Sequence, residues 1–195
     1  MSRAANIKLA SGGYLDLLNP KPEQIHIEDI AHGLSHICRF NGQTKIFYSV
    51  AQHCIMVSEL VPQHLALEAL LHDASEAYIG DVITPLKHLL PDYLEIEENL
   101  ERVIRQRFGI SLAHNPIIKK FDKIAVVSEK YALLDPHPLD EVHWHEYSSI
   151  KPLFIKAYAT SFGFIKSQFL ARFRELTDSV GRFQEDLDGY DQRAA

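Results

Sequence analysis

Residues 69–81 read ALLHDASEAYIGD and continue an apolar run, so a helix is predicted over residues 65–77. In such a helix Glu76 lies four residues after His72 and three after Asp73, and all three side chains can converge on one rim. An imidazole and a carboxylate beside a second, separately placed carboxylate suit one divalent metal ion and one group that transfers protons. The stretch therefore predicts both a helix and a site.

Turn residues divide the remaining sequence into further helical segments. Apolar residues recur at helical spacing over residues 30–40, 50–60, 93–108, 116 to about 134, and 152–176, the last interrupted near Gly163. A short extended piece is expected at residues 24–27 and a loop at residues 80–91. No segment alternates with period two for long enough to form a sheet. The sequence therefore predicts an all-α protein, a single helical bundle over residues 1–195 with its core at about 28–178 and a polar tail at 179–195.

The composition limits the classes of partner. The net charge is −6 and no run is dense in lysine and arginine, which argues against a nucleic acid polymer as partner. No apolar stretch approaches the ~20 residues that cross a bilayer, and the first residues lack the apolar region of a secretory signal. Cys38 and Cys54 lie in apolar segments without CxxC spacing and are expected to be reduced. We expect a cytoplasmic protein with no membrane partner.

Two other segments offer candidate metal ligands. His53 lies at the edge of the apolar face of residues 50–60, where a histidine is more often a hydrogen-bonded core residue. Asp122 lies on another apolar helix, where the alternative is a salt bridge to Lys119 or Lys123. Together with the adjacent histidine and aspartate quoted above, they suit a six-coordinate first-row metal ion with room for water. A closed structural zinc site would favour cysteine instead.

Five strings of residues follow one another in an order typical of a known family: YLDLLNP, IEDIAHGLSHICRFNG, FYSVAQHCIMVSELV, ALLHDASEAYIGDVITPLK and FDKIAVVSEKYALL. On these strings the chain resembles the HD-domain metal-dependent phosphohydrolases, in particular the YfbR-like 5′-deoxynucleotidases of bacteria and phages. The resemblance covers most of the chain. The His-Asp pair alone is a weak match, whereas the full LHDASEAYIGDVITPLK string, with a histidine upstream and an aspartate downstream, is specific.

The resemblance implies a role for each matching residue. The positions that bind a divalent metal ion (Co, Mn, Zn, Fe, Ni or Mg) are matched by His53, His72, Asp73 and Asp122. Glu76 matches an acidic residue that helps to activate the attacking water or to protonate the leaving group. Asp81 matches a second acidic residue near the sugar.

The resemblance also implies a substrate-binding set. Arg39 is similar to an arginine of the nucleotide pocket, and Lys87 matches a lysine near the phosphate. Phe40 stands where the deoxynucleotidase has tryptophan, which leaves the contact that selects the base or the sugar open. An arginine can bind phosphate through two parallel N–H bonds, whereas a lysine acts as a point charge.

The implied activity is hydrolysis of deoxynucleoside 5′-monophosphates to nucleoside and phosphate through metal-activated water. One alternative is a deoxynucleoside triphosphate triphosphohydrolase similar to the phage dATPases, and another is a catalytically silent nucleotide-binding module. More than three cations facing the phosphates would favour the triphosphate, and the candidates are Arg39, Lys87 and Lys45. The resemblance further implies a small-molecule (deoxy)nucleotide substrate and a homo-oligomer, a dimer or larger.

Two conspicuous motifs are given simpler interpretations. His143-Trp144-His145 has an H-x-H spacing but no second pair of ligands, so we interpret it as a lid or a contact between subunits. The glutamates of residues 95–98 are most simply a solvated helix face.

Overall fold

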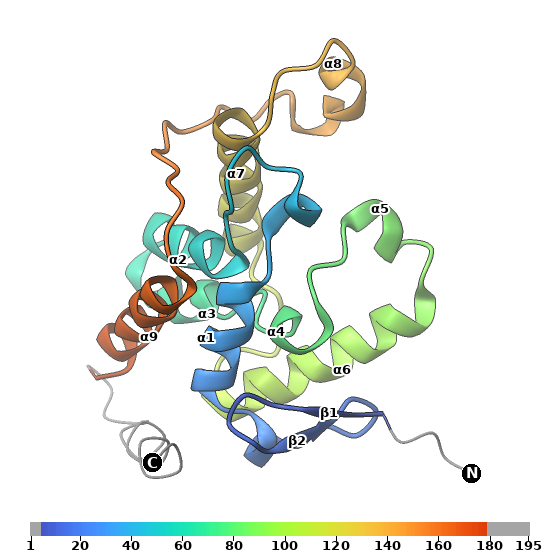
Figure 1. Cartoon of the computed structure of the whole chain (residues 1–195), viewed down its shortest axis with the longest axis vertical. Coiled ribbons are helices and arrows are strands. Elements are labelled where there is room, and N and C mark those ends of the chain that lie inside the picture. The colour runs from blue at the N-terminus through green and yellow to red at the C-terminus, as the bar shows by residue number, and fades with distance from the viewer. Residues whose placement is uncertain (1–4, 179–195) are drawn as a thin grey trace.

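The computed structural model describes residues 5–178, and helices dominate them, which confirms the predicted all-α class (Figure 1). The α-helices of this part of the chain are α1 (Ile27–His36), α2 (Val50–Leu60), α3 (Ala66–Leu70), α4 (Glu76–Ile79), α5 (Thr84–Lys87), α6 (Pro91–Phe108), α7 (Pro116–Leu133), α8 (Asp140–His143) and α9 (Phe162–Asp178). Four short 3-10 turns accompany them: η1 (Pro22–Gln24), η2 (Arg39–Gly42), η3 (Gln63–Leu65) and η4 (His145–Tyr147). The predicted polar tail, residues 179–195, lies outside the described residues. Within residues 5–178, no helix combines the length and the apolar character needed to cross a membrane.

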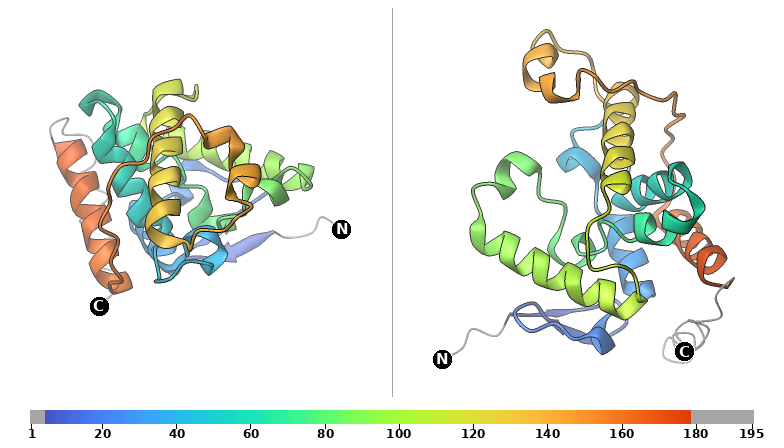
Figure 2. Two further views of the ribbon diagram at one scale, coloured as in Figure 1. Left: turned by 90° about the horizontal axis from the view of Figure 1, so that it is seen from above. Right: turned by 180° about the vertical axis from the view of Figure 1, so that it is seen from behind.

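Helices α1 and α2 form the centre of the bundle (Figures 1 and 2). Helix α1 packs on α9, α4 and α2, while α2 also packs on α3, α9 and α7. Their apolar faces meet in one buried cluster that contains Leu34, Val57 and Phe169. The cluster also takes in Leu15 and Ile25, which precede the first α-helix. Burial of this apolar surface is the main force that holds the helices together.

A capping box at its start and a proline after its end explain why α2 begins and ends where the sequence predicts. The Ser49 hydroxyl accepts from the Gln52 N–H at 3.2 Å, and Gln52 Oε1 accepts from the Ser49 N–H at 3.0 Å. This reciprocal pair is a capping box, which satisfies donors that the first turn leaves free. Pro62 stops the helix two residues after its end. The boundaries of α2 are thus set by its own sequence.

The predicted helix over residues 65–77 is wrong, because the chain forms two short helices there. Helix α3 ends at Leu70, Leu71 leaves the helical region with φ −103° and ψ 9°, and turns occupy residues 71–75 before α4 begins at Glu76. His72 and Asp73 therefore lie on a turn, not on a helix rim. This break allows both side chains to face α2 and α7.

Other boundaries also differ from the prediction. The loop expected at residues 80–91 contains the short helix α5 and the first residue of α6. The helix predicted over residues 30–40 is shifted, since α1 spans Ile27–His36 and Ile37 is already extended. Residues 152–161, predicted as the start of the last helix, form neither helix nor strand. Phe154 in this stretch is 97% exposed. Without a buried face, a short isolated helix is marginal in water.

A small antiparallel hairpin was not predicted. Strand β1 (Asn6–Lys8) pairs with β2 (Tyr14–Asp16), and Gly12 takes φ +88° in the connecting turn. The hairpin lies along α6 in the views of Figures 1 and 2. The extended piece predicted at residues 24–27 is confirmed only for Ile25 and His26, because η1 ends at Gln24 and α1 begins at Ile27.

We expect Gly33→Ala to destabilise the protein. A Cβ at Gly33 would lie 2.6 Å from the carbonyl oxygen of Ala77 and 2.9 Å from its Cα, so the backbone of α4 would have to move. Alanine adds about 1 kcal/mol of helix propensity, but overpacking against backbone costs more. Urea denaturation should show a net loss of about 1–3 kcal/mol. Gly13→Ala is the control, since the nearest atom is Ser11 Oγ at 3.7 Å; equal stability of both variants would contradict the close packing.

Candidate metal centre and active site

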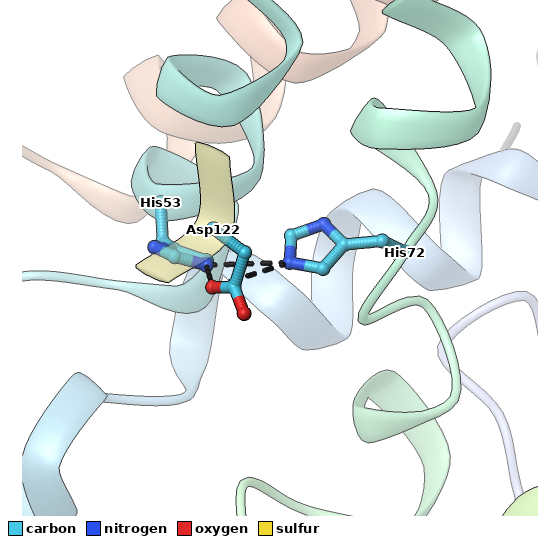
Figure 3. A group of neighbouring side chains, drawn as sticks. All are labelled: His53, His72 and Asp122. Atoms are coloured by element: carbon cyan, nitrogen blue, oxygen red, sulfur yellow. Dashed lines mark hydrogen bonds and ion pairs between the residues drawn. The ribbon is translucent and has the colours of Figure 1, made fainter. Parts of the chain in front are cut away.

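Side chains from three separate parts of the chain meet at one point. His53 comes from α2, His72 from the turn after α3, and Asp122 from α7, and Figure 3 shows them turned toward one another. His53 Nε2 lies 3.1 Å from Asp122 Oδ1 and 3.3 Å from His72 Nε2. Asp73 adds Oδ2, 3.2 Å from His72 Nε2 and 3.6 Å from His53 Nε2. The structure thus brings together the four residues that the sequence suggested as metal ligands.

The two imidazole rings are oriented by groups outside this cluster. His53 Nδ1 lies 2.8 Å from Glu129 Oε1, and His72 Nδ1 lies 2.8 Å from the carbonyl oxygen of Ala69. In each neutral ring Nδ1 would then donate, which leaves the lone pair of Nε2 facing the shared centre. A carboxylate or carbonyl behind a histidine is the usual support of a metal ligand.

The charge state of the cluster fits a divalent cation. Burial tends to lower the pKa of His72, but the carboxylate of Asp73 outweighs it and the pKa stands well above its ordinary value. Burial likewise opposes the charged form of Asp122, yet the hydrogen bond with His53 lowers the pKa of Asp122. The carboxylates thus attract positive charge, which a metal ion would supply in place of protons. Its affinity should fall as the pH falls.

Cys54 offers a second possible ligand group with His72 and Asp73. Cys54 is buried, and burial raises the pKa of its thiol to about 11. A thiol that keeps its proton at neutral pH is a poor ligand, since metals bind the thiolate. The group of two imidazoles and carboxylates fits a first-row divalent ion better.

Glu76 lies beside this cluster as the first residue of α4, and only 5% of it is exposed. Its Oε1 is 3.7 Å from Lys87 Nζ, and its Oε2 has no hydrogen-bond partner among the described residues. Burial, with the nearby charges of Asp73 and Asp81, raises the pKa of Glu76 well above its usual value. A carboxyl group whose pKa is raised in this way is suited to proton transfer.

Arg39 connects two carboxylates at the edge of the cluster. Its Nη2 lies 3.2 Å from Glu129 Oε2, and its Nη1 lies 3.6 Å from Asp81 Oδ2. Burial raises the pKa of Asp81 in spite of the nearby guanidinium. Phe40 follows with φ +53°, in the left-handed region that non-glycine residues rarely adopt. Such strain is typical of positions constrained by function.

Lys87 on α5 pairs with the carboxylates of Glu76 and Glu97. Its Nζ lies 2.6 Å from Glu97 Oε1 on α6, and Tyr93 on the same helix donates to the carbonyl oxygen of Gly80 at 3.1 Å. The interpretation of residues 95–98 as a solvated face is therefore wrong for Glu97, which is buried. Glu97 lies three residues before Leu100, which is buried on the same helix, and this spacing was the available signal.

Sequence reasoning also missed Glu129, which is completely buried. One of its oxygens bonds His53 and the other bonds Arg39, so it joins the cluster to the arginine. A signal was present, because Glu129 lies two helical turns after Asp122 and shares its side of α7. Lys45, suggested as a third cation, instead pairs with Asp135 at 3.0 Å and is 44% exposed.

We expect Glu129→Gln to weaken metal binding. Glutamine keeps an acceptor for His53 but replaces the other oxygen with an NH₂ group, which cannot accept from Arg39. Loss of such a support costs roughly 10–100-fold in metal affinity. Calorimetric titration with Mn²⁺ or Co²⁺ measures the change, and the exposed Glu98→Gln is the control. An affinity equal to that of the wild type would mean that Glu129 does not position His53.

Comparison with known proteins identifies relatives of the segment that carries this site. Residues 41–134 match the model of a family described as 5′-deoxynucleotidase YfbR-like. The chain is 48% identical over 126 residues to the uncharacterized protein YfdR of Escherichia coli K12, covering 64% of this chain and 70% of YfdR. It is 42% identical over 128 residues to an uncharacterized protein of Rhodobacter capsulatus, covering 60% of this chain and 65% of that protein. A protein named 5′-deoxynucleotidase, from Vibrio atlanticus, is 39% identical over 49 residues, 25% of each chain.

Proposed function

Because the chain belongs to the YfbR-like family, described as a family of 5′-deoxynucleotidases, we propose that it hydrolyses deoxynucleoside 5′-monophosphates to nucleoside and phosphate. The observation that carries this proposal is a buried Glu76, with a raised pKa, next to the cluster of His53, His72 and Asp122. The carboxyl group of Glu76 suits a leaving alkoxide that needs a proton. The cluster, with a divalent metal ion bound, suits a phosphate ester whose charge must be neutralised.

Each side chain of the site is assigned one role in the proposed reaction. We assign His53, His72, Asp73 and Asp122 to metal binding. A divalent ion held there would neutralise phosphate charge and ease the deprotonation of water. Arg39 can offer N–H groups to the phosphate oxygens, and Lys87 adds a positive charge. Glu76 gives its proton to the ester oxygen as the bond to phosphorus breaks. Asp81, paired with Arg39, orients the guanidinium and faces the sugar.

The count of cations favours a monophosphate over a triphosphate. Of the three candidates only Arg39 and Lys87 lie beside the cluster, and carboxylates already accompany both. Lys45 is exposed and paired elsewhere. A triphosphate carries more negative charge than two such cations can balance.

Product analysis tests the proposal directly. Metal-loaded protein is incubated with dAMP or dATP, and phosphorus NMR identifies the products. We expect inorganic phosphate from dAMP. Triphosphate from dATP, with dAMP unchanged, would replace the proposed substrate by a triphosphate. Silence on both substrates with metal bound would leave a nucleotide-binding module without catalysis.

We also propose that the described helices belong to one domain and that the protein works as a cytoplasmic homo-oligomer, a dimer or larger. Family resemblance supports this assembly, and exposed aromatic residues such as Phe154 and Phe164 are available for contacts. Analytical ultracentrifugation of the full chain measures the mass, and a monomer at all concentrations would contradict the proposal.

A further inference from the structure

The aromatic side chain of Phe40 has a second ring beside it. The ring centroids of Phe40 and Trp144 lie 6.5 Å apart with an angle of 46° between the planes. The two residues come from η2 and from the α8–η4 segment, residues 140–147, which are about a hundred positions apart in the chain. Trp144 therefore returns to the neighbourhood of Arg39, although the sequence motif that contains it suggested only a lid or a subunit contact.

This pair of rings lies next to the groups assigned to the phosphate. Arg39 Cζ is 5.4 Å from the centroid of the Phe40 ring, and the same guanidinium bonds Glu129, which bonds His53. A continuous line of contacts thus leads from the metal cluster through Arg39 to the two rings. In a nucleotide the base lies beyond the sugar, on the side away from the phosphate. This order of groups matches the line of contacts from the cluster through Arg39 to the two rings.

The spacing of the rings is close to that of a base sandwich. A planar base between two rings needs about 7–8 Å between them, two contacts of about 3.5–4.0 Å. A sandwich would therefore need the 6.5 Å separation to widen by about 1 Å and the 46° angle between the ring planes to close. Tyr147 and Lys130 contact the tryptophan ring at 5.5 Å and 5.2 Å, and the same ring borders a cavity of about 440 Å³. The ring is supported on one side and has room on another.

The backbone around Trp144, unlike that around Phe40, is suited to such a movement. Residues 134–139 and 148–161, on either side of the α8–η4 segment, form neither helix nor strand. In Figure 1 the segment lies beyond the end of α7, apart from the helices that surround α1 and α2. Phe40, in contrast, is fixed in a positive-φ conformation that costs free energy. One ring is held and the other is carried by a segment that can adjust.

We propose that the base of the nucleotide binds between Phe40 and Trp144, with Trp144 stacked on the face of the base opposite the one that contacts Phe40. This inference rests on the proposed nucleotide substrate and adds the group that distinguishes a nucleotide from a bare sugar phosphate. Stacking accepts any base, because every base has a π face. Trp144 thus determines selectivity for base-bearing substrates and leaves the choice among bases open.

The test uses the fact that the chain contains one tryptophan, so its fluorescence reports on this ring alone. Metal-loaded Glu76→Gln protein is titrated with dAMP and with 2-deoxyribose 5-phosphate, which has no base. We expect saturable quenching by dAMP and none by the sugar phosphate. Quenching by neither, at concentrations where calorimetry shows dAMP bound, would overturn the proposal.

Kinetics on the otherwise unaltered enzyme separates stacking from packing. Trp144→Ala should raise KM for dAMP by about 10- to 100-fold with kcat nearly unchanged, and Trp144→Phe should restore most of it. The inhibition constant of 2-deoxyribose 5-phosphate should stay the same. An equal loss for dAMP and the sugar phosphate would assign Trp144 to structure alone. Quenching by dAMP without hydrolysis would keep the base site and remove the proposed activity, so the two failures are distinguishable.

Discussion

Replacing Glu76 by glutamine is expected to lower kcat by about 10²–10⁴-fold, because glutamine keeps the shape of the side chain but cannot give up a proton in the same way. The carboxyl group is buried and its pKa is raised by burial and by the charges of Asp73 and Asp81. A group that acts as an acid must be protonated. The wild-type rate should therefore fall as the pH rises through the raised pKa, and the variant should lose this alkaline limb. Phosphate release from dAMP across a pH series measures both effects.

The matched control is Glu98→Gln, an exposed glutamate on α6, which should retain full activity. Metal affinity of Glu76→Gln should remain within a few-fold of the wild type, since Glu76 is not among the grouped ligand atoms. A kcat within threefold of the wild type would contradict the assignment of Glu76 as proton donor. A large loss of bound metal would instead place Glu76 among the ligands.

Asp122→Ala is expected to remove both the metal and the activity. Its Oδ1 is 3.1 Å from His53 Nε2, so the change deletes a carboxylate from the centre of the cluster. Metal ions contribute several kcal/mol to such hydrolyses, which corresponds to a loss of roughly 10³-fold or more in rate. Elemental analysis should show a loss of bound metal, and phosphate release should fall with it.

Chelation of the wild-type protein should have the same effect, and added Mn²⁺ or Co²⁺ should restore the wild type but not the variant. Asp92→Ala is the control, because Asp92 is an exposed carboxylate in the first turn of α6. Circular dichroism checks that Asp122→Ala still folds. Full activity after exhaustive chelation would exclude a metal-dependent reaction.

Helices whose own residues mark both ends could be predicted from the sequence. Helix α2 matches the prediction because a capping box and a proline bound it, and α7 begins at Pro116 behind the Asn115 cap. These signals act within a few residues and do not depend on the rest of the fold. The end of α6 at Gly109, which has φ +62°, belongs to the same class.

Elements that depend on distant contacts could not be predicted in this way. The residues around His72 favour a helix locally, but the chain forms a turn there in which His72 contacts His53 of α2 and Asp122 of α7. Residues 152–161 have apolar side chains at helical spacing, but no element within residues 5–178 buries them. The hairpin has strands of three residues, too short for an alternating pattern to show.

The grouping of the four candidate ligands was suggested by the family resemblance, and spacing along one helix would have given a wrong geometry. Glu129 was missed because a single glutamate in a helix normally points to water. Its partners, His53 and Arg39, are 76 and 90 positions away. Only the folded chain shows that this carboxylate is shared.

Helix α7 is attached to the described bundle chiefly through α2, and Asp122 and Glu129 are part of that seam. A metal ion bound by residues of α2, the turn and α7 would act as a cross-link between residues as far apart as His53 and Asp122, 69 positions along the chain. Its binding free energy would therefore also be folding free energy. At a concentration one hundred times Kd this linkage is worth about 2.7 kcal/mol. The supply of metal in the cell would then govern how long each molecule survives as well as how fast it works.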